Sequence, residues 1–142
     1  MRVNLNMEGL EVALKELDDL AMKAGDAIED VVEDAIILTH ELAVKGINSG
    51  PATGRVYQRG NIVHQASAPG QYPMADRGGL APSVSFDFTT AGEKFTGTVG
   101  TNLVYGLYLE TGTSRMAARP WLLRSIETAA RNVANELRAR LK

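Results

Sequence analysis

The stretch that decides the fold class is residues 83–99, SVSFDFTTAGEKFTGTV. Phe86 and Phe88 alternate with polar residues, which is typical of a strand with one buried face. Residues 90–93 predict a turn, and the alternation resumes over residues 95–99. The sequence therefore predicts an antiparallel hairpin in the second half of the chain. For the following segment, 104–109, the pattern leaves an extended and a short helical conformation open.

Helical periodicity surrounds this hairpin on both sides. Apolar residues recur every three or four positions from Glu8 to Ala21, and again from Asp26 to shortly before Gly50-Pro51. A third stripe follows Pro120, which suits the first position of a helix. These patterns predict one α+β domain over residues 1–142. In it, N-terminal amphipathic helices and a C-terminal helix pack on one small antiparallel β-sheet.

A long Gly/Pro-rich loop occupies residues 48–82 and has no sustained period. A loop of this length inside a small domain is usually functional or disordered. A flexible surface insertion is one interpretation. The other, which we favour, is an arm that docks on a neighbouring molecule, because the loop contains several side chains suited to a contact. The candidate arm residues are Tyr57, Ile62, Val63, His64 and Tyr72.

The composition offers little material for catalysis. The chain has no cysteine and only two histidines, which excludes thiolate sites and leaves no candidate catalytic, metal-binding or cofactor-binding residues. Paired acidic residues on the helices are expected to be solvated. No apolar run is long enough to span a bilayer, and residues 1–5 do not resemble an export signal. We therefore expect a protein that is not an enzyme, needs no cofactor and has no membrane partner.

Charge is distributed unevenly along the chain. Residues 1–50 carry a net charge of −7 and residues 51–142 a net charge of +5. Two solvated helix faces of opposite sign would explain this difference. Alternatively, the acidic face of one subunit contacts the basic face of another, because complementary potentials steer association.

The most informative motif is Tyr105-Gly-Leu-Tyr-Leu-Glu-Thr-Gly-Thr113, followed by Ala118-Arg-Pro-Trp-Leu-Leu123. Gly112 permits a turn that other residues resist, and the hydroxyl of Thr113 can cap it. We expect Glu110 to pair with Arg115 or Arg119, and Trp121 to anchor the last helix on the sheet. A tight corner between two elements and a direct partner contact both fit this pattern.

This motif resembles the neck, or tail-completion, proteins of long-tailed bacteriophages, a group related to the lambda tail completion protein Z. The resemblance extends from about residue 7 to the C-terminus, with Trp121 where relatives usually have phenylalanine. It implies that the motif residues make the family's characteristic assembly contacts. These residues are Tyr105, Tyr108, Glu110, Gly112, Thr113, Arg119, Pro120 and Trp121.

The resemblance implies a structural protein of a phage or prophage virion, assembled in the cytoplasm of the bacterial host. Such proteins form a homo-oligomeric ring at the head–tail interface, between the connector and the tail tube or terminator, and genomic DNA passes through it. An acidic face would repel DNA in the lumen, and the candidates are Glu29, Asp30, Glu33 and Asp34. Two alternatives are a tail terminator-type ring and a DNA-binding module that uses the basic C-terminal helix.

Overall fold

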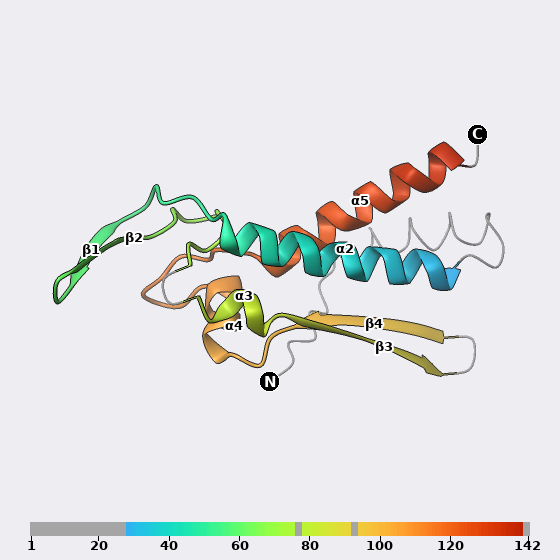
Figure 1. The fold of residues 1–142 in the computed structure, drawn as a ribbon, viewed down its shortest axis with the longest axis horizontal. Coiled ribbons are helices and arrows are strands. Elements are labelled where there is room, and N and C mark those ends of the chain that lie inside the picture. Colours follow the sequence, from blue (N-terminus) through green and yellow to red (C-terminus); the bar gives the residue numbers. More distant parts are fainter. Residues whose placement is uncertain (1–27, 76–77, 92–93, 141–142) are drawn as a thin grey trace.

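The computed structural model describes residues 28–75, 78–91 and 94–140. Their helices and strands form an α+β fold with two separate two-stranded antiparallel sheets (Figure 1). In chain order the elements are α2 (Ile28–Asn48), β1 (Val56–Arg59), β2 (Ile62–Gln65), α3 (Leu80–Ser83), β3 (Ser85–Ala91), β4 (Lys94–Gly100), α4 (Val104–Thr111) and α5 (Leu122–Arg140).

The two long helices, α2 and α5, pack against each other through small and branched side chains. Val31 and Ala35 of α2 contact the buried face of α5, and Leu38 covers the edge of this cluster. Alanines allow the two helix backbones to approach closely, and the removal of the apolar surface from water stabilises the pair. The contributing residues of α5 are Ala130, Val133, Ala134 and Leu137.

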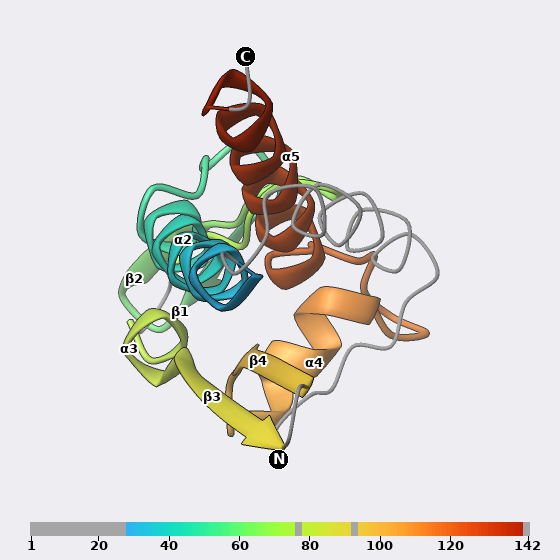
Figure 2. The same cartoon turned by 90° about the vertical axis from the view of Figure 1, so that its right-hand side faces the viewer.

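The β3–β4 hairpin covers another side of α2. Figure 2 shows the hairpin and α4 below α2, with α5 above it. Phe86 pairs with Val99 across the hairpin, and the Phe86 ring lies edge-on to His40 of α2 with 5.0 Å between ring centroids. His40 also donates from Nε2 to the carbonyl of Val84 at 3.1 Å. The predicted hairpin is thus confirmed, and one of its faces contacts a helix.

The main core lies where the C-terminal end of α2 meets α3, β4 and the start of α5. Trp121 is its largest buried side chain, with 1% of its surface exposed, and it is surrounded by residues from all of these elements. The other buried members are Ala43, Ile47, Leu80, Ala81, Val84, Val99 and Leu122.

The structure corrects the sequence expectations in two places and decides between the two alternatives in a third. The sheet is not single, because residues 56–65 of the long loop form a second hairpin of their own. Residues 104–111 are helical, which resolves the ambiguity in that segment. The last helix begins at Leu122, so Pro120 precedes it and is not its first residue. The helix expected over residues 8–21 lies outside the described residues.

Candidate functional site

Glu110, in the last turn of α4, caps the N-terminus of α5. Glu110 is 7% exposed, and its carboxylate accepts three backbone hydrogen bonds. Oε2 accepts the N–H groups of Trp121 and Leu122, each at 2.8 Å, and Oε1 accepts that of Leu123 at 2.9 Å. These donors have no partner within the helix, and the helix dipole favours a negative charge at this position. The prediction that Glu110 pairs with Arg115 or Arg119 is therefore wrong.

Arg119 fastens the base of the long loop to the α4–α5 corner. Its Nε and Nη2 atoms donate to the carbonyl of Ser67 at 3.1 and 3.0 Å, and its backbone N–H donates to Leu109 at 2.6 Å. Two hydrogen bonds from a guanidinium that converge on one carbonyl oxygen restrict both position and orientation. This residue of the motif thus holds two distant parts of the chain together.

Trp121 anchors the start of α5 on α4. Its indole Nε1 donates to the carbonyl of Gly106 at 2.9 Å, so the polar atom of this buried ring is satisfied. The sequence correctly predicted an anchoring role for Trp121. However, the hydrogen bond that orients the ring goes to α4 and not to the sheet.

Gly112 and Thr113 form the turn that ends α4. Gly112 has a φ of 75°, and its N–H donates to the carbonyl of Tyr108 at 2.8 Å. The hydroxyl of Thr113 accepts the N–H of Arg115 at 3.2 Å, as the sequence predicted. Thr113 also forms an isolated β-bridge with Met116, so the turn folds back on itself.

Tyr105 and Tyr108 are the two aromatic motif residues that stay exposed, and Tyr105 also lines the cleft described below. Their exposed fractions are 45% and 49%, whereas Gly106 and Glu110 of the same helix are buried. An exposed aromatic side chain provides a large contact area at low entropic cost. The structure therefore separates the motif into residues that build the corner and two tyrosines that are available for a contact.

The β1–β2 hairpin forms the arm and extends from the end of the molecule (Figure 1). Tyr57 pairs with His64 across the hairpin, with their rings 5.2 Å apart, and Arg59 lies over the Tyr57 ring at 5.5 Å. His64 is half-buried, and the other seven strand side chains are exposed, including Ile62 at 69% and Val63 at 66%.

Tyr72 does not belong to the free part of this arm. Its hydroxyl lies 3.0 Å from the Oγ atom of Ser125, and Arg124 lies over its ring at 5.2 Å. Arg124 also donates to the carbonyl of Gly70. Gly70 and Tyr72 are therefore bound to α5, and Tyr72 is not part of the exposed hairpin.

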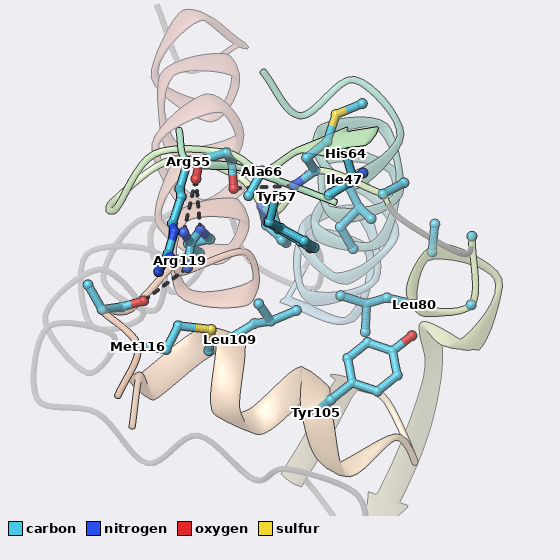
Figure 3. Close-up of a pocket in the computed structure, with 18 of the residues that line it drawn as sticks. Ile47, Arg55, Tyr57, His64, Ala66, Leu80, Tyr105, Leu109, Met116 and Arg119 are labelled. Carbon is cyan, nitrogen blue, oxygen red and sulfur yellow. Dashed lines mark hydrogen bonds between the residues drawn. The ribbon is translucent and has the colours of Figure 1, made fainter. Parts of the chain in front are cut away.

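A cleft of about 900 Å³ lies between the hairpin, residues 73–81, α4 and the turn after α4 (Figure 3). Four arginines line it: Arg55, Arg59, Arg115 and Arg119. Arg55 and Arg119 project into the same part of the cleft from different segments. No acidic residue of the described chain lines the cleft. Arg55 and Arg59 were not predicted as site residues, because nothing in their local sequence links them to residues 115–119.

The four acidic residues expected to face a lumen are exposed in the first turns of α2. This end of the helix lies opposite the end that carries the hairpin (Figure 1). Exposed carboxylates fit a contact with a neighbouring subunit as well as a position in a lumen. The luminal position of Glu29, Asp30, Glu33 and Asp34 therefore stays a prediction.

Within the described ranges, no group of three or more acidic or histidine side chains could hold a metal ion. The helices of the same ranges include none that is long and apolar enough to cross a membrane. Comparisons with protein-family models, with curated proteins and with solved structures found no significant match.

Proposed function

We propose that this protein is a structural, non-enzymatic component of a phage or prophage virion. It joins or completes the head–tail interface as one subunit of a ring around the DNA passage, and it assembles in the host cytoplasm. The observation that carries the proposal is the β1–β2 hairpin, which extends from the body and exposes nearly all of its side chains.

The energetics of this hairpin support a role in assembly. An isolated two-stranded hairpin is marginally stable in water, because it buries little apolar surface. Val56, Ile62 and Val63 are each more than half exposed and would lose that exposure in a contact with another subunit. Burial of an exposed aliphatic side chain contributes about 1.5–3 kcal/mol. The arm is therefore expected to dock on a neighbour in the ring or on an adjoining connector or tail protein.

The resemblance at the α4–α5 corner supports the same function. Glu110, Arg119 and Trp121 form internal bonds that fix the corner and the base of the arm. Such residues would give each subunit a rigid frame from which the arm and the two exposed tyrosines reach a partner. A tail terminator-type ring would use the same surfaces and would differ in the structure that it caps.

The alternative DNA-binding function of α5 has weaker support. Arg124 is held by Gly70 and Tyr72 and is less available for a phosphate contact. A module that binds duplex DNA by itself needs several free cations on one face.

Light scattering tests the proposal directly. The molar mass of the purified protein is measured alone and after mixing with tail tubes or DNA-filled heads of the same phage. A ring, or protein added at one end of the particle, is the expected result. A monomer that ignores both particles and binds duplex DNA in a salt-sensitive manner would contradict it.

A double substitution then tests the role of the arm. Ile62→Ser with Val63→Ser should abolish addition to the particle without changing the melting temperature, since both side chains are exposed. Asn132→Ser, at an exposed position of α5, is the control and should assemble normally. Normal assembly of the hairpin variant would exclude the arm as the contact.

A further inference from the structure

The cleft beside the hairpin concentrates positive charge without a compensating acid among the described residues. Arg55 and Arg115 are both exposed, and no hydrogen bond or ion pair of their side chains to another described residue is found. Arg119 also lines the cleft, although its guanidinium binds the Ser67 carbonyl. Guanidinium groups that converge from separate segments repel one another and favour an anionic ligand, with which they form strong, charge-assisted hydrogen bonds.

The floor of the cleft indicates which anion fits. Ile47, Leu80, Leu109 and Met116 contribute apolar surface, and Tyr105 lies at one side (Figure 3). Tyr57 also lines the cleft, but its ring already contacts Arg59 and His64 within the hairpin. Nucleic-acid sites present cations and stacked aromatic rings along a phosphate backbone. An apolar floor with a rim of arginines is instead suited to a protein segment that carries both carboxylates and aliphatic groups.

A segment with suitable carboxylates lies at the other end of the same chain. Glu29, Asp30, Glu33 and Asp34 are exposed at the start of α2, and the half-buried Val32 lies between them, whereas Val31 and Ala35 are buried against α5. No described residue forms a hydrogen bond or ion pair with these four carboxylates. They are separated from the hairpin end by the length of a 21-residue helix, about 30 Å. These carboxylates are therefore too far from the cleft of their own subunit to pair with it.

We propose that the arginine-lined cleft of one subunit binds the acidic end of α2 of a second copy. This inference deepens the proposed function and depends on it, because it identifies the two surfaces by which subunits of the ring join. The contact is heterologous: each copy offers its cleft to one neighbour and its acidic end to the other. Such a contact closes into a ring when the rotation between subunits permits. It assigns the four carboxylates to a neighbour and not to the lumen.

Charge reversal tests this contact. One variant carries Arg55→Glu and Arg115→Glu in the cleft. The other carries Glu33→Lys and Asp34→Lys, which lie beyond the first turn of α2, so that the helix terminus keeps its favourable charges. Each variant alone should lower the association constant of the ring about tenfold or more. All four positions are exposed, so the melting temperatures should stay close to that of the parent protein.

Rescue distinguishes a direct contact from a general effect of charge. The variant with all four reversals should recover assembly, and so should an equimolar mixture of the two double variants, because each interface again joins opposite charges. Glu41→Lys combined with Arg131→Glu reverses exposed charges elsewhere and should assemble as the parent does.

Three outcomes would overturn the inference. The first is a ring that forms equally well from either double variant. The second is loss of assembly without rescue. The third is normal assembly of the Glu33→Lys, Asp34→Lys variant with impaired DNA ejection, which would place these carboxylates in the lumen. Failure of the parent protein to form a ring or to add to phage particles would instead contradict the proposed function itself.

Discussion

The carboxylate of Glu110 and the backbone N–H of Trp121 lie 2.8 Å apart, across the corner between α4 and α5. The same carboxylate accepts the next two backbone N–H groups, so one side chain satisfies the first free donors of a 19-residue helix. These three hydrogen bonds fix the direction in which α5 leaves the corner. Because Arg119 holds the base of the arm from the same corner, the arm and the long helix are oriented together.

We expect Glu110→Gln to destabilise the protein by about 2 kcal/mol, because the amide has one acceptor oxygen and places an NH₂ donor against backbone N–H groups. For a chain of this length the melting temperature should fall by about 5 °C. Thermal unfolding followed by circular dichroism measures this change. Glu41→Gln, at an exposed position of α2, is the matched control and should melt like the parent protein. Equal melting of both variants would contradict the capping role.

Gly112→Ala should destabilise the corner by about 1–3 kcal/mol. The φ of 75° is unfavourable for alanine, and the added Cβ would lie 2.9 Å from the backbone N of Ala118 and the carbonyl O of Met116. Gly60→Ala is a useful comparison, since Gly60 also has a positive φ, of 57°, but open space around it. Urea unfolding should show the larger loss for Gly112→Ala. A similar loss at both positions would mean that the close approach of the added Cβ to Met116 and Ala118 does not contribute to the destabilisation.

Trypsin should cut the free protein after Arg55 and Arg59, because both residues are exposed on or beside the hairpin. Assembly with phage particles should suppress these cuts, as the arm becomes covered. Mass spectrometry of the fragments identifies the sites, and exposed Arg131 of α5 provides an internal reference. Equal cleavage of the hairpin in the free and assembled states would show that the arm stays uncovered.

The double variant Tyr105→Ser, Tyr108→Ser tests the two exposed tyrosines. Each substitution should change the free energy of unfolding by only about 0.5 kcal/mol, as is usual for exposed positions. The same variant should add poorly to phage particles if these tyrosines contact a partner. Tyr72→Phe should behave in the opposite way. It removes the hydroxyl that lies 3.0 Å from Ser125 and should cost about 1 kcal/mol of stability, with assembly unchanged. Poor assembly of Tyr72→Phe together with normal assembly of the double variant would show that Tyr72, and not Tyr105 or Tyr108, contacts the partner.

The α+β class, the helix over residues 28–48 and the hairpin over residues 85–100 could be predicted from the sequence. Each of these features repeats with a short period along the chain, so a window of about ten to twenty residues contains the whole signal. The hairpin within the long loop was not predicted, because the apolar residues of its four-residue strands are adjacent pairs, Val56-Tyr57 and Ile62-Val63, and do not alternate with polar ones. The two residues between the strands, Gly60-Asn61, are its one local signal.

The sequence by itself identified the motif residues that an ordinary protein surface would not need, including Glu110, Gly112, Arg119 and Trp121. Only the tertiary structure decided what Glu110 binds, because the sequence pattern does not show whether a carboxylate meets a guanidinium or the N-terminus of a helix. The cleft also required the fold, since its arginines come from residues 55–59 and 115–119. Local periodicity determines secondary structure, whereas the position of a charge in space depends on how distant segments pack.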